Sequence, residues 1–386
     1  MRNMKKVTSI LVAGVLALAA AGCGSNKTAP APAATQAATT AAPAATESAV
    51  EEATEATTEA AAEITESADG SLVDADAAAK AEHVITWCDS QPASSLLGQK
   101  ILKFGEILQE KSDGRLVLQF YPSAMLGNGT TCMQQVQLGD LDIYRCDAAA
   151  LYDFGVDSEK VISLPYLFKD RDSAVDKVKN SDAGQTLLDD ISNSGTGFQG
   201  IGWFIDTPRR FFVANKEVHT LDDLKGLKIR AVETAITLDY KAALGMNPVP
   251  LSMSEVYTAF STGVIDAAAN TVDSFTNNKF DEVCHYIVLN NGMIPCYPVV
   301  FSQATWGKFS AEDQQLIIDC LAEASSEYDE ECVALEEKET ADLEAKGVKF
   351  CEVEDEDKWA EACQPIIDKY GAGYEDLVAD LTTWGK

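Results

Sequence analysis

Arg230 is the residue whose type and position most directly suggest binding chemistry. It follows residues 227–229, a short apolar run typical of a buried strand, and stands where that strand would end. In open α/β sheets, ligands bind beyond the carboxyl ends of the strands. A guanidinium group at such an end offers a planar set of donors that matches a carboxylate. Arg230 is therefore a candidate carboxylate ligand. The alternative is a structural ion pair, because most charged side chains are solvated or paired.

Short helices and strands around Arg230 must position it. Asp222 and Asp223 suit the first turn of a helix, where acids face the positive end of the helix dipole, and Gly226 suits the end of that helix. After Arg230, the pattern predicts helices at 234–244 and 254–261, and strands near 248–250 and 263–266.

The segment upstream of Arg230 has the pattern of a second α/β unit. Predicted strands and helices alternate along it at residues 84–87, 96–111, 115–121, 131–138 and 141–144. Short apolar strands joined by helical crossovers predict a parallel sheet. Further downstream, residues 312–346 form one helical pattern that is much longer than an ordinary globular helix.

Three blocks of sequence around Arg230 carry a family resemblance. They read L-D-D-L-K-G-L-K-I-R (221–230), A-L-G-M-N-P-V-P-L (243–251) and E-V-Y-T-A-F-S-T-G-V-I-D (255–266). In their letters, order and spacing they resemble the solute receptors of TRAP (tripartite ATP-independent periplasmic) transporters, of the DctP type. Weaker similarity extends the resemblance from about residue 82 to the C-terminus.

The resemblance implies a fold, a ligand class and partners. The fold is an α/β, two-lobed, periplasmic-binding-protein-like (type II, flytrap) fold, in which a long C-terminal helix braces both lobes. The ligand is a small organic acid bound through its carboxylate, and the partners are the membrane subunits of a TRAP transporter. We expect no cofactor and no metal.

The resemblance also assigns binding roles by position. It implies that Arg230 forms a salt bridge with the ligand carboxylate, that Arg210 is a second arginine ligand, and that Asn270 donates a hydrogen bond from its amide. Arg209 takes the place of Arg210 if the register slips by one residue. Successive strand residues face opposite sides, so only one of these two arginines can point into the cleft.

Other candidate ligand contacts are expected with less support from the family pattern. An often aromatic position falls at Met253, an often acidic one falls at Thr131, and residues 266–270 read D-A-A-A-N where the family often has D-G-x-E-N. Trp87 and Gln91 lie at or after the first strand of the upstream unit, and Arg145 ends its third strand. These departures leave the far end of the ligand open.

The N-terminal 80 residues do not have a globular pattern. Residues 1–23 combine a basic start, a short apolar run and a lipobox-like A-A-G-C, which predicts a lipoprotein signal peptide with Cys23 as the lipidated residue. Residues 24–80 are mostly Ala, Thr, Pro, Glu and Ser, and predict a disordered tether because they offer almost nothing to bury. We therefore expect an extracytoplasmic protein anchored by its acyl chains to the outer face of the cell membrane, which is periplasmic in a Gram-negative source.

The remaining residues are long for a single domain, so we expect two lobes. The predicted divisions are 81–208 for lobe I (with C-terminal segments returning to it), 209–303 for lobe II, and 304–386 for the long bracing helix and the last helices.

Net charge and cysteine content argue against two kinds of function, nucleic-acid binding and zinc binding. The formal net charge of −31 argues against nucleic acid as a partner, and it means that an anionic ligand must be held by local arginines. Besides Cys23 there are nine scattered cysteines without a C-x-x-C pair, and only three histidines, which argues against a zinc site. We expect these nine mostly as buried thiols.

Two other functions are alternatives to a TRAP receptor. An enzyme is disfavoured because the chain lacks a G-x-S-x-G motif, a phosphate-binding loop and a recognisable Cys–His or His–carboxylate set. A receptor that feeds an ABC-type permease or a sensor kinase is the second alternative, and the order of the three blocks favours TRAP over it.

Overall fold

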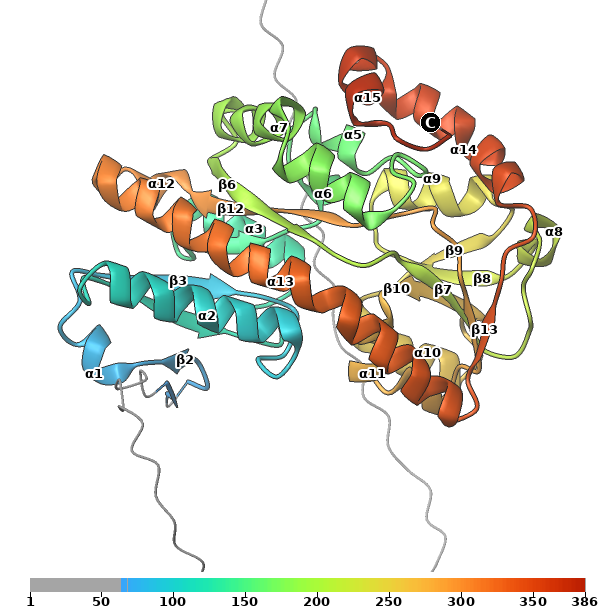
Figure 1. Cartoon of the computed structure of the whole chain (residues 1–386), viewed down its shortest axis with the longest axis horizontal. Coiled ribbons are helices and arrows are strands. Elements are labelled where there is room, and N and C mark those ends of the chain that lie inside the picture. The colour runs from blue at the N-terminus through green and yellow to red at the C-terminus, as the bar shows by residue number, and fades with distance from the viewer. Residues whose placement is uncertain (1–63, 68, 386) are drawn as a thin grey trace, which may run out of the picture. The chain divides into compact units, whose positions relative to one another are not determined.

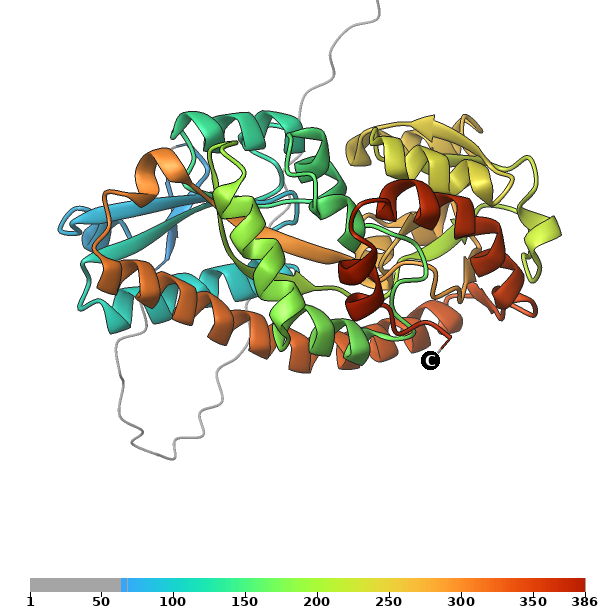
Figure 2. The same cartoon turned by 90° about the horizontal axis from the view of Figure 1, so that it is seen from above.

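The computed structural model describes residues 64–67 and 69–385. The predicted signal peptide with Cys23, and residues 24–63 of the predicted tether, lie outside the described residues. The described chain contains two β-sheets, each covered by helices on both faces, and one long helix that packs on both (Figures 1 and 2).

The first sheet has seven strands in the order β1-β2-β4-β3-β5-β12-β6. Its strands are β1 (Thr65–Glu66), β2 (Leu72–Val73), β3 (His83–Cys88), β4 (Leu116–Tyr121), β5 (Ile143–Arg145), β6 (Phe198–Ile205) and β12 (Cys296–Ser302). The predicted parallel arrangement is confirmed for β4, β3 and β5. The other pairings are antiparallel: those of β1 with β2 and of β2 with β4, and those of β12, which returns from the second sheet and inserts between β5 and β6.

The second sheet has six strands in the order β13-β11-β7-β10-β8-β9. Its strands are β7 (Arg210–Val213), β8 (Lys228–Ala231), β9 (Asn247–Pro250), β10 (Ala267–Asn270), β11 (Tyr286–Val288) and β13 (Lys349–Cys351). Strand β8 runs parallel to both β9 and β10, whereas β7 is antiparallel to β10 and β11.

Helices cover the first sheet on both faces. They are α1 (Ala75–Ala78), α2 (Leu96–Lys111), α3 (Gly129–Leu138), α4 (Ala148–Asp153), α5 (Glu159–Ile162), α6 (Arg171–Lys179), α7 (Asp182–Asn193) and α12 (Gln303–Trp306). Helix α2 begins after the cap Ser95, whose hydroxyl accepts from the Gly98 N–H, and α3 ends at Gly139 in the left-handed conformation that glycine favours.

The second sheet is enclosed in the same way. Its helical segments are α8 (Leu221–Leu224), α9 (Ala235–Ala243), η1 (Met253–Glu255), α10 (Val256–Ser261), α11 (Val272–Asn277) and η2 (Phe280–Glu282), and the chain ends in α13 (Ala311–Ala345), α14 (Glu356–Gly371) and α15 (Glu375–Leu381). Apolar side chains of α10 and α11 pack on one face of this sheet, and those of α9 and α14 on the other.

The long helix α13 confirms the predicted brace. It is 35 residues long and begins at the capping residue Ser310. At its middle, Glu327 and Glu331 form ion pairs with Lys100 of α2 at 3.0 and 2.7 Å. Its C-terminal end packs Leu343 among the residues of α11 and η2, and Figure 1 shows it passing both sheets.

Two short segments connect the sheets beside α13. Residues 206–209 lead from β6 to β7, and residues 289–295 lead from β11 back to β12. They lie side by side, because the N–H groups of Asp206 and Arg209 donate to the carbonyls of Pro295 and Met293, each at 2.9 Å. Strand β12 therefore belongs to the first sheet, although the predicted boundary placed residues up to 303 in lobe II.

The end of the predicted tether is ordered and belongs to the fold. Strands β1 and β2 form a hairpin, and β2 pairs with the edge strand β4. The Val73 side chain is buried, and Gln119 of β4 donates to the Ser71 hydroxyl at 2.8 Å. The expected tether limit at residue 80 is therefore wrong. The short apolar pair at residues 72–73 is enough to add a strand, because the edge of β4 supplies the partner.

Among the described residues, no helix is both long enough and apolar enough to cross a membrane. The nine cysteines of this part of the chain are all buried thiols. The closest pair is Cys132 and Cys88, whose sulfurs lie 3.7 Å apart.

Deleting residues 64–80 should destabilise the protein. The deletion removes the buried Val73 and the hydrogen bonds to β4 and α2, which together contribute about 2–4 kcal/mol. Thermal unfolding should show a clearly lower Tm. The control deletes residues 24–40, an equal length whose composition predicts no core. Equal Tm values for the two deletions would contradict a structural role for the hairpin.

The packing of α11 against α13 predicts a stability that falls as the pH rises. Burial, followed by the nearby carboxylate of Asp273, raises the pKa of Glu339 to about 7. Burial likewise raises the pKa of Asp273 to about 6, and nearby Asp206 adds to this shift. The folded protein thus retains protons that the unfolded chain has lost, so this stability is present at low pH and is lost as the pH rises to about 7.

Glu339→Gln should therefore increase the free energy of unfolding at pH 8 by about 1 kcal/mol, which raises the Tm by roughly 2–4 °C. The Tm of this variant should also depend less on pH. Glu337→Gln, on an exposed position of the same helix, is the matched control. If the Tm of Glu339→Gln followed the wild-type pH profile, Glu339 would not be the source of the pH-dependent stability.

Candidate functional site

One edge of the second sheet carries the predicted ligand residues. Asn270 of β10 is directly opposite Arg210 of β7, and Ala267 is opposite Ile229 of β8. Because side chains alternate along each strand, this register places Arg210, Arg230 and Asn270 on the same face at the same edge. That face is the one covered by α10 and α11.

Arg230 has no carboxylate partner in the part of the chain that the structure describes. Its Nε donates to the Leu251 carbonyl at 3.0 Å, and no ion pair holds it within residues 64–67 and 69–385. Burial, followed by the nearby positive charge of Arg209, lowers the pKa of Arg230 to about 10. A cation in this position is stabilised by any anion that enters beside it.

Arg209 faces the opposite side from Arg210 and links the two halves of the protein. Its guanidinium donates to the Asp147 carboxylate at 3.1 Å and to the Tyr297 hydroxyl at 2.6 Å. Asp147 caps α4, and Tyr297 belongs to β12, so both partners belong to the first lobe. The Nε of Arg209 has no hydrogen-bond partner in the described structure.

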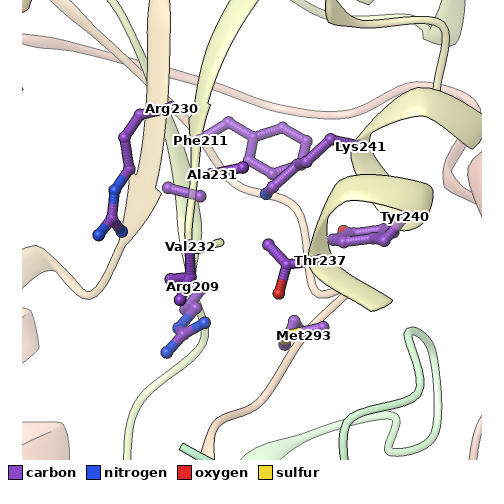
Figure 3. Close-up of a pocket in the computed structure, with 10 residues that line it drawn as sticks. Arg209, Phe211, Arg230, Ala231, Val232, Thr237, Tyr240, Lys241 and Met293 are labelled. Carbon is purple, nitrogen blue, oxygen red and sulfur yellow. The ribbon is translucent and has the colours of Figure 1, made fainter. Parts of the chain in front are cut away.

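A small cavity of about 20 Å³ lies beside Arg209 and Arg230, between β8 and α9. Its other lining residues are Phe211, Ala231, Val232, Thr237, Tyr240, Lys241, Ala269 and Met293. In Figure 3, the side chain of Arg230 lies on one side of the strand ribbons, and those of Tyr240, Thr237 and Lys241 lie on the other. The cavity thus reaches both faces of the sheet at its edge.

Arg210 has partners within the protein. It donates to the Asn290 carbonyl at 2.8 Å and to the Asn291 side-chain oxygen at 2.9 Å, and its Nε lies 3.6 Å from a carboxylate oxygen of Glu336 on α13. The predicted opposite orientation of Arg209 and Arg210 is observed, but it divides their roles. Arg210 shares the face of Arg230, whereas Arg209 lines the cavity.

Arg145 is neutralised by an acid of its own lobe. Its Nε and Nη2 donate to the two carboxylate oxygens of Asp89 at 3.0 and 3.2 Å, and its guanidinium lies 4.2 Å from the ring centroid of Tyr297. It is 7% exposed. Arg145 therefore holds the strand ends of the first sheet together beside Tyr297, and its charge is already neutralised by Asp89.

Asn270 and Met253 lie together on the Arg230 face. The Asn270 amide nitrogen donates to the Ser274 hydroxyl at 2.8 Å and lies 3.9 Å from the Met253 sulfur. Its side-chain oxygen accepts from the Thr271 N–H at 3.0 Å. Both side chains are half-buried.

The first-lobe candidates differ in their surroundings. The Trp87 ring is fully buried and packs edge-on against Phe104 of α2, so the expected ligand contact of Trp87 is wrong. The reason is the alternation of β3, which turns Trp87 to the same core face as Ile85. Gln91 is half-buried in the loop after β3, and Thr131 is exposed and donates from its hydroxyl to Asn128.

Lys241 is a site residue that the sequence analysis did not identify. It is 5% exposed on α9 and lines the cavity. Its Nζ lies 4.3 Å from the ring centroid of Phe211 and 4.8 Å from that of Tyr240. The available signal was its position beside the apolar stripe of α9, between Tyr240 and Leu244, where a lysine cannot reach solvent freely.

Comparisons with known proteins identify the family of this chain. Residues 88–373 match the family model described as bacterial extracellular solute-binding protein, family 7 (DctP). The chain belongs to this family. Members are solute-binding receptors of extracytoplasmic transport, and the DctP-type receptors serve TRAP transporters, so the predicted family, fold and extracytoplasmic class are confirmed.

Individual relatives of this DctP-family protein have known ligands. The sialic acid-binding periplasmic protein SiaP of Vibrio cholerae is 28% identical over 69% of this chain and 81% of its own length. The C4-dicarboxylate-binding periplasmic protein DctP of Rhodobacter capsulatus is 28% identical over 70% and 81%.

A solved structure shares the whole fold. The TRAP periplasmic solute-binding protein of Pseudomonas putida F1, crystallised with bound D-glucuronate, has 28% sequence identity and a TM-score of 0.74. The match covers 78% of this chain and 96% of that one. These comparisons give no support to a receptor for an ABC-type permease or a sensor kinase.

Proposed function

We propose that this DctP-family receptor binds a small organic acid by its carboxylate at Arg230 and delivers it to TRAP membrane subunits. The observation that carries the proposal is the unpaired guanidinium of Arg230. It lies half-buried at the edge of the second sheet, where each neighbouring arginine has a carboxylate partner and Arg230 has none among the described residues. An entering carboxylate would supply the missing charge and accept its free donors.

Neighbouring groups would complete the site. Asn270 and Met253 lie on the same face as Arg230 and would contact the ligand beside its carboxylate. Gln91 would reach it from the first lobe. Arg209 and Arg210 would act mainly by holding the two lobes in register, and Arg145 by holding the strand ends of the first lobe together, since each already binds an acid of the protein.

The ligands of similar structures support the carboxylate. The Pseudomonas putida and Citrobacter koseri proteins hold D-glucuronate, an acid of the kind proposed here. Lobe closure would couple binding to delivery, because residues 206–209 and 289–295 form a narrow double connection between the sheets. A purely binding role, without catalysis, is part of the proposal.

The proposal includes the membrane anchor. The A-A-G-C sequence at residues 20–23, after a basic start and a short apolar run, supports lipidation of Cys23. An acyl anchor would keep the receptor at the membrane surface, close to the transporter subunits.

Arg230→Met should weaken ligand binding at least about a hundredfold. Two charge-assisted hydrogen bonds, worth about 1.5–3 kcal/mol each, are lost. Arg230→Lys should also bind poorly, because an ammonium lacks the planar arrangement of donors. Calorimetry measures the affinities, with D-glucuronate tried first and other organic acids then ranked by thermal shift.

The apo Tm distinguishes this role from a structural one. It should be unchanged or higher in Arg230→Met, because an uncompensated buried charge is removed. Arg115→Met, at a half-buried arginine paired with Asp313, is the control and should keep ligand affinity. A lower Tm with near-native affinity in Arg230→Met would refute the carboxylate clamp.

Cys23→Ala should release the protein from the membrane. Without the thiol, no acyl chain can be attached, so the protein should move to the soluble fraction or retain its signal peptide. Membrane fractionation with mass spectrometry of the N-terminus measures this, and Ser25→Ala is the control. Wild-type protein without an acylated Cys23 would refute the anchor.

A further inference from the structure

Two buried thiols of the first lobe, Cys88 and Cys132, lie in direct contact. Cys88 ends β3 and Cys132 lies on α3, 44 positions further along the chain, and their sulfurs are 3.7 Å apart. Both side chains are fully buried. No other two cysteine sulfurs lie within hydrogen-bonding distance in the part of the chain that the structure describes. Of the nine described thiols, these two are therefore the ones placed to react with each other.

The elements that carry the two thiols favour a bond between them. Strand β3 is hydrogen-bonded on both sides, to β4 and β5, and α3 packs its apolar side chains on the same sheet. The two sulfurs must approach by only about 1.7 Å to reach disulfide distance. Side-chain rotation with a small adjustment of α3 is enough for such an approach. A disulfide can therefore form while the sheet stays in place.

The two thiols differ in reactivity. The hydrogen bond from the Cys132 thiol lowers the pKa of Cys88, although burial opposes this shift, and the Leu126 N–H adds to it. The same hydrogen bond, together with burial, raises the pKa of Cys132. Because the thiolate is the attacking form in thiol–disulfide exchange, Cys88 is the nucleophile of the pair and Cys132 is the resolving thiol.

A short loop between β4 and α3, residues 122–127, covers the two sulfurs. The Gly127 carbonyl lies 3.5 Å from the Cys132 sulfur, and the Leu126 N–H is directed at the sulfur of Cys88. The same loop reaches the surface, since Met125 is 41% exposed. Opening of this loop would therefore expose the pair without unfolding the sheet.

The backbone of this loop is strained, which favours its opening. Ser123 and Ala124 have φ values of 55° and 56°, in the left-handed region that is unfavourable for residues with a Cβ atom. Two hydrogen bonds hold them to the loop after β3: the Ser123 N–H donates to the Gln91 carbonyl at 2.9 Å, and the Ala124 N–H donates to that of Asp89 at 2.8 Å. Loss of these two bonds releases the strain.

We propose that Cys88 and Cys132 are a redox-active pair that an extracytoplasmic disulfide oxidises to an intramolecular disulfide. The Cys88 thiolate attacks one sulfur of the oxidant, and the other sulfur of the oxidant leaves as a thiolate. Cys132 then attacks the Cys88 sulfur of this mixed disulfide and displaces the second half of the oxidant. The two electrons lost by the cysteines reduce the oxidant to two thiols, which also take up the two thiol protons.

The location and the surroundings of the pair give this reaction a role. Disulfides form and persist outside the cytoplasm, where receptors of this family act. The bond would tie α3 to the base of the loop that carries Asp89, the partner of Arg145, and Gln91. Oxidation would thereby fix the first-lobe side of the binding site. This inference goes beyond the proposed function and does not depend on the identity of the ligand.

Reaction of the folded protein with oxidised glutathione tests the pair. The full chain is reduced, freed of reductant and exposed to oxidised glutathione without denaturant, and it is then unfolded in an alkylating reagent. Peptide mass spectrometry should find a disulfide between Cys88 and Cys132, with the other seven of the nine cysteines alkylated. The oxidised protein should have a Tm about 3–8 °C higher than that of the reduced protein, because the bond restricts the unfolded chain.

Single variants separate the roles of the two thiols. Cys88→Ala and Cys132→Ala should each abolish the disulfide and the difference in Tm. Cys132→Ala should retain glutathione on Cys88, whereas Cys88→Ala should retain none. The matched control is Cys146→Ala, at a buried thiol of the same core cluster whose sulfur donates to the Pro298 carbonyl, and it should oxidise like the wild type.

Nine alkylated cysteines in the wild type after this treatment would overturn the proposal, and so would a disulfide that forms only in denatured protein. Equal Tm values for the oxidised and reduced forms would refute the effect on the first lobe. Glutathione retained on Cys132 in Cys88→Ala would refute Cys88 as the attacking thiol. None of these outcomes bears on the Arg230 site, because no receptor ligand takes part in the experiment.

Discussion

The antiparallel pairing of β7 with β10 determines where the charged groups of the site lie. The register sets Asn270 opposite Arg210, and the parallel contact of β10 with β8 aligns Arg230 with the same face. Because side chains alternate, Arg209 must then face the other way, toward Tyr297 and the cavity. A slip of one residue in β7 would exchange the two arginines, and with them the contacts to Asp147 and Glu336.

Local pairing explains how an acidic protein can bind an anion. The chain carries a formal charge of −31, so its overall field repels an organic acid. At the cleft, acids of the protein neutralise three arginines, through Asp89, Asp147 and Glu336. Arg230 and Lys241 remain without an acidic partner in the described structure, so the positive charge available to a ligand lies at the edge of β8. Burial strengthens this local effect because the surroundings screen it less than water does.

Helix α13 and the double connection between the sheets set the limits of movement. The helix is tied to α2 through Lys100 and to the connecting segments through Tyr328, whose hydroxyl donates to Asp206, and through Glu336 near Arg210. A change in the angle between the lobes must therefore adjust contacts of α13 with both. Arg209, which reaches Asp147 and Tyr297 from the start of β7, joins the lobes at the site itself.

The sequence by itself determined the local elements and the main ligand candidate. Capping residues such as Ser95 and Ser310, the glycine at 139 and the period of the apolar residues are local signals, so helices α2, α3 and α13 could be predicted closely. Arg230 was identified from its strand end and the family blocks.

The tertiary structure decided what depends on distant partners: the hairpin at residues 65–73 needs the edge of β4, β12 needs a gap between β5 and β6, and Trp87 faces the core because α2 covers it. It also decided which arginines have acids beside them and that Lys241 enters a cavity without one. These facts arise from side chains far apart in the chain, and no local pattern encodes which of them meet.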